Sequence, residues 1–312
     1  MSLRSRTMTS IHSCCPAVLR DEGTAPDIIL RRWLNEVSFV LAGIGAGFSA
    51  SAGLNYLDEN FFRTCFPAHA ASGIRSAWEA VGRYWDPVPG KETEYWGYWA
   101  RHIHVMRYEP PCLPAYADLA NVIRKKDWFI LSTNADGQTH KTGLDETRIF
   151  TPQGDYSLFQ CSQPCREEVW NNRKEVERML ERMPDPLHIR EQDVPRCPHC
   201  GRLAVPNLRK DDSFVDTLYR EGHPRYRAFL DRALEDPGRL LLLELGVGFN
   251  TPGIIRLPFE RLAETTAARL IRLNLKDAAL SEKIGDNGVG LALDAAAVLR
   301  RISHETNIGK FD

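Results

Sequence analysis

Four cysteines form two pairs with the spacing of metal ligands. Cys161 and Cys165 make the first pair, and Cys197 and Cys200 make the second. Two such pairs can close a tetrahedral Zn²⁺ site, and four thiolates leave no coordination position open for a substrate. Four unrelated thiols would not explain two correctly spaced pairs, and we interpret His199, inside the second pair, as a spacer. The spacing therefore predicts one structural zinc ion.

A glycine-rich turn, GIGAGFSASAG, contains Gly43, Gly45, Gly47 and Gly53. Glycines in such a turn let backbone amides approach a pyrophosphate at the start of a helix. The spacing is not the strict dinucleotide fingerprint, which also requires an acidic residue about 20 residues further on. Tight packing of a strand against a helix explains the same glycines, so both interpretations stay open.

Apolar segments of strand length alternate with helical patterns along most of the chain. The first is predicted as a strand over Val37–Ala42, followed by the glycine turn and by a helix that begins near Ser49. Further strands are predicted at the start of DWFILSTNADG and in RIFTP, RLLLLELGVG and ARLIRLNL. Strands that alternate with helices predict an α/β fold with a doubly wound, mostly parallel sheet covered on both faces.

The middle of the chain has a different composition. The segment REEVWNNRKEVERMLERM is highly charged and predicts the solvated outer helix of a small lobe. The segment EAVGRYWDPVPGKETEYWGYWARHI contains Trp78, Trp85, Trp96 and Trp99. Trp96 and Trp99 lie three residues apart, which suits one buried helix face. We therefore interpret the aromatic cluster as the core of a helical lobe, with a ligand-stacking surface as the alternative.

Length and charge exclude several functional classes. The 312 residues suffice for one large α/β domain with an insert, or for two modest domains. With 40 basic and 41 acidic residues, the formal net charge of −1 gives no field that would favour nucleic acid or a membrane surface. The longest apolar stretches contain Ser, several Gly or a central Glu, so none is predicted to span a membrane. Small molecules and proteins remain as partners.

The number of cysteines and the composition of the N-terminus indicate where in the cell the protein is expected. Eight cysteines are too few for a disulfide scaffold, and the metal-ligand spacing of four favours a reducing compartment. The N-terminus is rich in Arg, Ser and Thr and has no acidic residue before Asp21, which resembles an organellar transit peptide. We predict a disordered leader over residues 1–26 and a cytoplasmic location, with a mitochondrial or other organellar location as the alternative.

Four motifs resemble those of the sirtuin family, in the same order, and the resemblance runs from about Val37 to Leu299. They are GAGFSASAGL, STNADGQTHKTGLD, TPQGD and the two cysteine pairs. ELGVGFNTP and IRLN resemble the family's ribose-binding turn and its adenosine-side strand end. Together with FFRTCFP and EYWGYWARHI, these segments resemble class M, the macrodomain-linked branch of the family.

The resemblance implies a Rossmann-like NAD-binding domain and a smaller second domain, with NAD between them at the carboxyl ends of the strands. We assign residues 27–57, 106–157 and 213–312 to the large domain. The small domain would consist of a helical insert over residues 58–105 and a zinc-binding module over residues 158–212.

The resemblance also assigns residues that handle NAD. The implied catalytic residues are Asn134, Gln153 and Arg209. Asn134 would orient the ribose hydroxyls, and Asp136 would hold the nicotinamide carboxamide. Arg209 could bind an acceptor carboxylate or a phosphate, or it could be a solvated surface residue within RKDD. The implied cofactor-binding positions are Gly45, Ala46, Gly47, Ser49, Gly53, Asn134, Asp136, Gly246, Gly248, Asn250, Asn274 and Asp286. For the last two of these, a plain turn is the alternative.

Two departures from the common sirtuin deacylases bear on the reaction. Where those enzymes have a His that acts as general base, this chain has Gln153. An amide can orient a hydroxyl group but cannot accept its proton. In addition, VPNLRKDDSF, which follows the second cysteine pair, differs from the loop that helps those enzymes hold an acyl-lysine peptide. Both departures argue against the usual deacylation.

The class M resemblance implies protein ADP-ribosyltransferase activity that uses NAD. It further implies a protein acceptor, namely a lipoylated carrier related to the glycine-cleavage H protein, and a functional link to a macrodomain hydrolase. Two alternatives remain. The chain could be an NAD-dependent protein-lysine deacylase that tolerates Gln153, or a non-enzymatic sensor of NAD or ADP-ribose.

Overall fold

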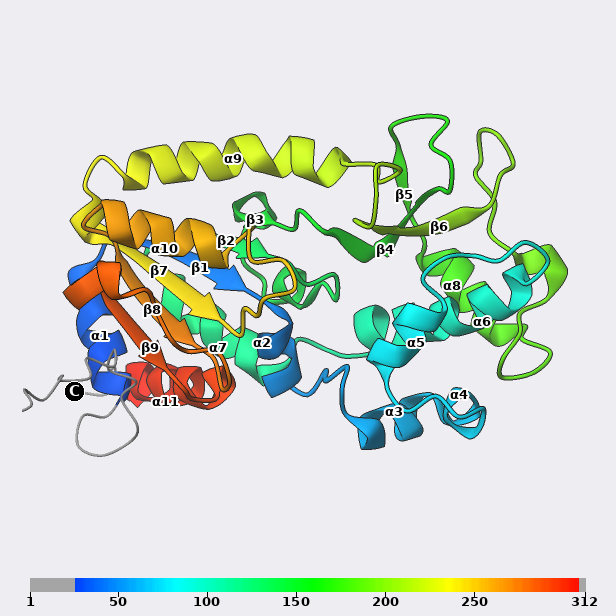
Figure 1. The fold of residues 1–312 in the computed structure, drawn as a ribbon, viewed down its shortest axis with the longest axis horizontal. Helices are drawn as coiled ribbons and strands as arrows, with labels where there is room; N and C mark the ends of the chain where they lie inside the picture. Colours follow the sequence, from blue (N-terminus) through cyan, green and yellow to red (C-terminus); the bar gives the residue numbers. More distant parts are fainter. Residues whose placement is uncertain (1–25, 309–312) are drawn as a thin grey trace, which may run out of the picture.

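The computed structural model describes residues 26–308 of the chain. The leader predicted over residues 1–26 lies outside the described residues apart from Pro26. Figure 1 shows two bodies, one built around a six-stranded sheet and the other around a three-stranded sheet. Among residues 26–308, no helix combines the length and the apolar character needed to cross a bilayer.

All six strands of the larger sheet run parallel, in the order β3-β2-β1-β7-β8-β9. They are β1 (Phe39–Ile44), β2 (Asp127–Ser132), β3 (Ile149–Phe150), β7 (Leu240–Leu245), β8 (Arg269–Leu273) and β9 (Gly288–Leu291). The strand order reverses between β1 and β7, and open α/β sheets bind ligands at such a switch point. The predicted doubly wound parallel sheet is therefore confirmed.

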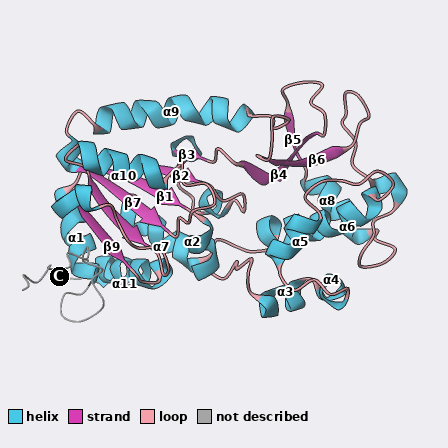
Figure 2. Ribbon diagram, in the orientation of Figure 1, coloured by secondary structure: helices cyan, strands magenta, loops and turns pink. Residues whose placement is uncertain are grey.

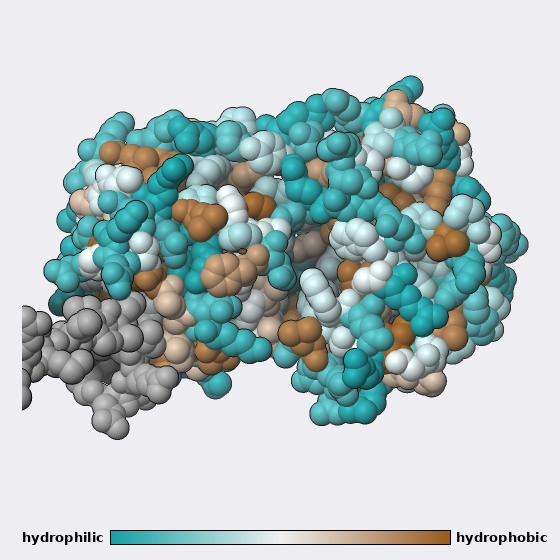
Figure 3. Space-filling model, viewed as in Figure 1, coloured by the Kyte–Doolittle hydropathy of each residue, from teal (hydrophilic) through white to brown (hydrophobic). Residues whose placement is uncertain are grey.

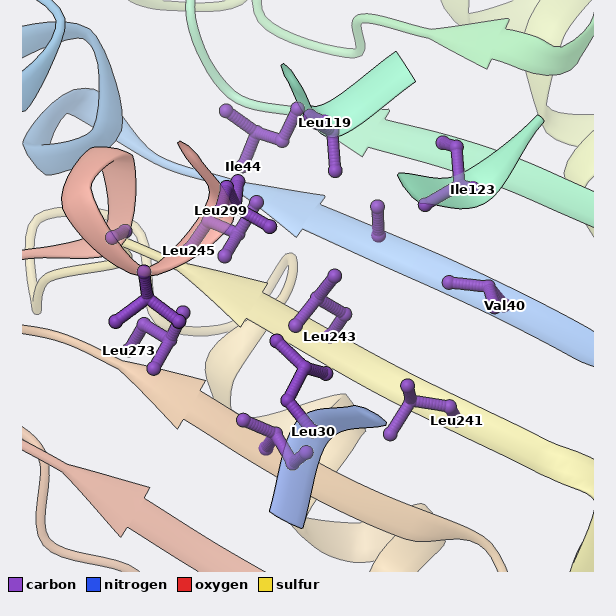
Figure 4. Close-up of a cluster of buried hydrophobic side chains, with 14 of the residues drawn as sticks. Leu30, Val40, Ile44, Leu119, Ile123, Leu241, Leu243, Leu245, Leu273 and Leu299 are labelled. Carbon is purple, nitrogen blue, oxygen red and sulfur yellow. The ribbon is translucent and has the colours of Figure 1, made fainter. Parts of the chain in front are cut away.

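Helices cover both faces of this sheet. They are α1 (Pro26–Glu36), α7 (Pro114–Ile123) and α11 (Ala295–Ile308) on one face, and α9 (Thr217–Ala233) and α10 (Arg256–Thr265) on the other. Leu241 and Leu243 of β7 pack with Leu30 of α1 (Figure 4), whereas Leu240 and Leu242 pack against α9 and α10. Because both faces are covered, β7 is rich in Leu at successive positions and does not alternate with polar residues.

The second body contains an antiparallel sheet with the order β5-β4-β6. Its strands are β4 (Gly154–Cys161), β5 (Val169–Asn171) and β6 (Ala204–Leu208). The helices of this body, which Figure 2 shows beside the small sheet, are α3 (Glu59–Cys65), α4 (Pro67–Ala71), α5 (Ala77–Arg83), α6 (Glu92–Ile103) and α8 (Arg173–Glu181). The helix predicted across the charged segment begins only at Arg173, because β5 precedes it.

Aromatic side chains form the core of the second body. Trp96 and Trp99 are both fully buried, and the ring of Trp96 lies 4.7 Å from that of Phe159 on β4. The predicted buried helix face is therefore confirmed. Trp78 differs from them, because 57% of it is exposed.

Some predicted boundaries shift in the structure. The first strand ends at Ile44 and not at Ala42, and α2 (Ala46–Ser51) follows after one residue. The helix thus begins three residues before the predicted Ser49, directly inside the glycine turn. The last strand, β9, was not predicted, because GVGL is short and rich in glycine.

Short helical turns connect the main elements. The 3₁₀ turns are Gln138–Lys141, Glu146–Arg148, Glu191–Asp193, Pro237–Arg239 and Glu282–Asn287, and one π-helical turn spans His104–Tyr108. The π-helical turn extends α6 toward the larger sheet.

Candidate functional site

Loops at the carboxyl edge of the larger sheet carry most of the predicted site residues. Ile44 at the end of β1 lies opposite Ser132 of β2 and Leu245 of β7, and Leu245 lies opposite Leu273 of β8. The polar residues that follow these strands therefore meet along one edge. Figure 3 shows the surface hollowed between the two bodies, next to this edge.

Asp286 does not lie at this edge. It belongs to the turn Glu282–Asn287, which precedes β9, so it sits near the amino end of that strand. Asn274 directly follows β8 and lies at the carboxyl end. The structure therefore does not bring Asp286 together with the other predicted residues.

The glycine turn after β1 packs directly against the loop after β7. The amides of Gly45 and Gly47 donate to the carbonyls of Leu245 at 3.0 Å and Gly246 at 2.9 Å. A Cβ atom on Gly45 would lie 2.7 Å from the Gly246 oxygen, and one on Gly246, whose φ is +59°, would lie 2.1 Å from the Phe48 nitrogen. Close approach of two backbones therefore explains these glycines, and it brings the two loops together.

Asn134 and Asp136, which follow β2, meet Ser49 of α2. The Asn134 Nδ2 donates to the Gly45 carbonyl at 3.0 Å and to Ser49 Oγ at 2.9 Å. Ser49 Oγ donates to Asp136 Oδ2 at 2.5 Å, and Tyr116 OH of α7 lies 2.7 Å from the same Ser49 oxygen. The predicted residues thus form one hydrogen-bonded group. Sequence reasoning missed Tyr116, because only the fold brings α7 next to α2.

Asp136 is almost completely buried within this group. Burial raises the pKa of its carboxyl group, and hydrogen bonds from Ser49 and from the Gln138 amide oppose the rise. Each carboxylate oxygen can accept more than one hydrogen bond. The carboxylate of Asp136 therefore retains acceptor capacity for a ligand amide.

Gln153 lies in the turn between β3 and β4, beside the loop that carries Asn134. The Tyr156 amide, just after this turn, donates to the Ala135 carbonyl at 2.9 Å. Gly154 has a φ of +97°, and a Cβ atom on it would lie 2.0 Å from the Asn207 oxygen of β6. Only glycine fits this position, so the turn that holds Gln153 is packed against the small sheet.

Arg209 is adjacent to Gln153 in space. The Arg209 amide donates to the Gln153 carbonyl at 3.0 Å, and its Nε donates to the Pro152 carbonyl at 3.3 Å. The guanidinium is exposed and stacks over the rings of Phe214 at 4.9 Å and Tyr219 at 5.6 Å. The structure thus brings Arg209 to the turn of Gln153, and the guanidinium stays accessible on one side.

An ion pair between Arg107 and Asp155 was not predicted. Arg107 comes from the π-helical turn, and its Nε lies 2.8 Å from Asp155 Oδ1. Its guanidinium also packs on Gly137, where a Cβ atom would lie 2.2 Å from the Arg107 Cζ. Burial alone would raise the pKa of Asp155, but the charge of Arg107 and hydrogen bonds from Arg107 and Ser157 outweigh this effect and lower the pKa. Arg107 therefore connects the loop after β2 with the start of β4.

Replacing Arg107 by Met should lower the free energy of unfolding by about 3–5 kcal/mol near neutral pH, because Asp155 would lose its buried partner. The pKa of Asp155 is lowered in the folded state, so its contribution exists above the unfolded pKa of about 3.9 and disappears as the pH falls through the folded value. Urea unfolding at several pH values should show the difference shrinking toward acid pH. Arg227→Met, which breaks an exposed pair with Asp231, serves as the control and should change stability little.

The loop after β7 is held from two sides. Asn274 Nδ2 donates to the Val247 carbonyl at 2.9 Å, and the Asn274 Oδ1 accepts from the Lys276 and Asp277 amides. A Cβ atom on Gly248 would have no neighbour within 4 Å, and Asn250 is exposed. Gly246, Gly248, Asn250 and Asn274 therefore lie together at the carboxyl edge.

Four charged side chains are packed beneath this loop. Arg272 Nε and Nη2 bind both oxygens of Glu244, at 2.6 and 2.9 Å, and Arg272 Nη1 binds Glu260 at 2.7 Å. Arg256 Nη1 donates to the Val247 carbonyl at 3.2 Å and lies 3.7 Å from Glu244 Oε1. Glu244, Arg256 and Arg272 are buried, so these charges depend on one another. We call this set the buried ionic cluster.

The four predicted metal ligands lie together in the second body. The Sγ atoms of Cys161, Cys165, Cys197 and Cys200 all lie within 4.8 Å of one another. Two of the distances are 3.6 Å, between Cys161 and Cys200, and 3.7 Å, between Cys165 and Cys197. A tetrahedral ion with Zn–S bonds of about 2.3 Å would place its sulfurs about 3.8 Å apart. The donor set and its spacing therefore fit zinc, while His199 contacts Glu168 at 2.7 Å.

Two curated proteins are similar to this chain in sequence, although no protein family model matches it. A protein ADP-ribosyltransferase of Staphylococcus aureus is 30% identical over 292 residues, which cover 91% of this chain and 89% of the relative. A probable bifunctional ADP-ribose hydrolase/ADP-ribosyltransferase of Fusarium oxysporum is 31% identical over 259 residues. These cover 79% of this chain but 42% of that longer protein.

Solved sirtuin structures share the fold. Sir2Tm bound to a propionylated peptide has a TM-score of 0.54 and 17% identity, with 91% of this chain and all of that chain covered. A mutant Sir2 homologue in complex with ADP-ribose has a TM-score of 0.55 and 15% identity, with 91% and 98% covered. Together with the nearly full-length similarity to the Staphylococcus protein, these findings show that the chain belongs to the sirtuin-type protein ADP-ribosyltransferases.

Proposed function

We propose that this chain cleaves the bond between nicotinamide and ribose in NAD and transfers the ADP-ribosyl group to a protein acceptor. One observation carries the proposal. Asn134 and Asp136 lie at the carboxyl edge beside a turn in which an amide, Gln153, and not an imidazole precedes Gly154. Such a site can hold and orient a nucleotide sugar, but it lacks the base that the usual deacylation requires at this position.

The loops after β1 and β2 would bind the nicotinamide half of the cofactor. When bound, NAD supplies a glycosidic bond whose cleavage releases neutral nicotinamide and leaves positive charge on the ribose. Asp136 has the acceptor capacity to hold the carboxamide, and Asn134 lies within the same group to orient the ribose hydroxyls. The reacting sugar would lie in the hollow between the two bodies (Figure 3).

Gln153 would contact the same ribose from the side of the small sheet. Its side chain can accept a hydrogen bond from a hydroxyl and donate one, but it takes up no proton at neutral pH. The ribose hydroxyl therefore stays protonated and is a poor nucleophile toward an acyl group. Attack on the sugar by an external acceptor is then the favoured outcome.

Arg209 would act on the acceptor side. Its guanidinium is exposed beside the turn of Gln153 and is supported by the rings of Phe214 and Tyr219. A guanidinium in this position can bind a carboxylate or phosphate through two parallel hydrogen bonds. We assign to it an anionic group on the acceptor or on the cofactor.

A lipoylated carrier protein related to the glycine-cleavage H protein is the acceptor that we propose. Its support is the class M resemblance of the sequence. The Fusarium relative is a probable bifunctional protein that combines an ADP-ribose hydrolase with an ADP-ribosyltransferase. We accordingly propose that a macrodomain hydrolase removes the modification that this chain adds.

Incubation with adenylate-labelled NAD and total cell protein, with and without the lipoylated carrier, tests this function. Transfer of the label to protein supports an ADP-ribosyltransferase, and stronger labelling with the carrier supports the proposed acceptor. Release of an acyl-ribose product from acylated peptide would instead support a deacylase. Binding of NAD without either product would support a sensor and would contradict the proposal.

Replacing Gln153 by His should not restore deacylation, although it supplies an imidazole. The loop after the second cysteine pair still lacks the residues that hold an acyl-lysine peptide, so we expect at most trace deacylation and a loss of much of the transfer activity. The rate of the variant should fall as the pH drops through about 6 to 7, whereas the rate of the wild type should not. Titration of Asp136 would affect the pH–rate profiles of both proteins equally, so a difference between the two profiles reports the imidazole of the variant.

Gln192→His is the matched control, because it places an imidazole on an exposed turn of the second body. Its pH profile and transfer rate should equal those of the wild type. Robust acyl-lysine hydrolysis by the wild type, or a large gain of it in the Gln153→His variant, would favour the deacylase.

A further inference from the structure

The hydroxyl group of Tyr116 contacts the site from α7, a helix that carries none of the predicted site residues. Tyr116 is fully buried, and its ring packs on Phe48 of α2 with centroids 4.7 Å apart. Its oxygen lies 2.7 Å from Ser49 Oγ and 3.4 Å from Asn134 Nδ2. The hydroxyl therefore contacts both groups that surround the candidate ribose position.

The carbonyl of Gly45 determines how the Asn134 amide is turned. A backbone carbonyl can only accept a hydrogen bond, so the atom of Asn134 that lies 3.0 Å from it must be Nδ2. The same Nδ2 lies 2.9 Å from Ser49 Oγ, which therefore accepts its second hydrogen. Both amide hydrogens are thus bound within the protein, and Asn134 Oδ1 points away from Gly45 and Ser49. No described residue donates to that oxygen.

The direction in which the Ser49 hydroxyl donates its hydrogen is also determined. Asp136 Oδ2 lies 2.5 Å from Ser49 Oγ, and an ionised carboxylate can only accept, so Ser49 donates its single hydrogen there. The Ser49 oxygen has two lone pairs, and Asn134 occupies one of them. Tyr116 can then contact Ser49 only as a donor to the second lone pair. Every hydrogen in this group has one consistent position.

We propose that Tyr116 is a positioning residue, whose hydroxyl fixes Ser49 and thereby the Asn134 amide, with Oδ1 of Asn134 directed at the substrate ribose. The inference rests on the proposed function. Without this hydroxyl, Ser49 keeps its hydrogen bond to Asp136 but loses the donor that holds its oxygen toward α7, so the oxygen that accepts from the Asn134 amide can shift. No described hydrogen bond joins Tyr116 to Asp136, and its hydroxyl acts on the ribose through Ser49 and Asn134, so the effect should fall on turnover and not on nucleotide affinity.

Tyr116→Phe tests the inference, because it removes the hydroxyl and keeps the ring that packs on Phe48. We expect kcat for nicotinamide release to fall about tenfold, the Kd for NAD to stay within about twofold, and the melting temperature to change little. Tyr98→Phe is the matched control. It removes an equally buried hydroxyl that contacts His102 at 2.8 Å in the second body, and it should leave kcat unchanged.

A double-mutant cycle with Ser49→Ala separates positioning from general packing. If Tyr116 acts through Ser49, adding Tyr116→Phe to Ser49→Ala should lower kcat no further, whereas independent effects would multiply. A kcat for Tyr116→Phe equal to that of the wild type, or multiplicative effects, would overturn this inference alone. Absence of nicotinamide release by the wild type would overturn the proposed function as well.

Discussion

Replacement of Asn134 by Ala should reduce nicotinamide release and ADP-ribosyl transfer by about a hundredfold or more, while NAD affinity changes little. The side chain lies between the loops after β1 and β2, with both amide hydrogens bound to Gly45 and Ser49. In the proposed reaction, its remaining oxygen would act on the ribose as the bond to nicotinamide breaks. An interaction that strengthens in the transition state lowers kcat when it is removed and leaves ground-state binding in place.

Calorimetric titration with NAD and a continuous assay of nicotinamide would measure the two quantities separately. Asn121→Ala is the control, since Asn121 is also half-buried and makes a single side-chain contact, with Ser303 at 3.3 Å, away from the site. It should retain wild-type turnover. Turnover of the Asn134→Ala variant within a few-fold of the wild type would show that Asn134 does not act on the ribose.

Replacement of Cys197 by Ser should abolish zinc binding and unfold the second body. Cys197 is buried, and structural zinc contributes about 10–16 kcal/mol of apparent binding free energy to the folding of small metal modules. Cys161, another ligand, ends β4, the strand that begins at Gly154 directly after Gln153. Loss of the ion should therefore disturb the turn of Gln153, and transferase activity should be lost together with the metal.

Metal analysis of the wild type should find close to one zinc ion per chain, and limited proteolysis should cut the Cys197→Ser variant between residues 158 and 212. A strong chelator should produce the same cleavage pattern in the wild type. Cys65→Ser, which changes a thiol outside the cluster at the end of α3, should keep its zinc and its activity. Folded, active protein without metal would contradict the structural role.

The larger sheet was predictable because its strands are buried on both faces. Such strands appear in the sequence as short apolar runs such as LLLLEL, separated by helices, which is typical of a parallel sheet. The strands β4, β5 and β6 of the small sheet and β9 of the larger sheet were not predicted. β5 and β9 have only three and four residues and no distinct pattern. The cysteine cluster was predictable because ligand spacing is a local property.

The contacts that complete the site are not local. Arg107 and Asp155 are separated by 48 positions, and Ser49 and Tyr116 by 67. Ser49 and Asp155 each lie in a motif, but their partners Tyr116 and Arg107 do not, and each pair is brought together only in the folded chain. The sequence also gave no sign that GDNG, which contains Asp286, precedes a strand, so the position of Asp286 near the amino end of β9 could not be predicted.

The buried ionic cluster constrains how descendants of this sequence can diverge. Loss of Arg272 alone would leave Glu244 buried without its main partner, at a cost of about 3–5 kcal/mol, which is a large share of the stability of a domain. Replacement of all the charges together by apolar residues of similar volume can be neutral. Single steps away from the cluster therefore pass through poorly folded intermediates that selection removes. We expect Glu244, Arg256, Glu260 and Arg272 to be inherited as a block, so that lineages differ by possessing the whole set or none of it.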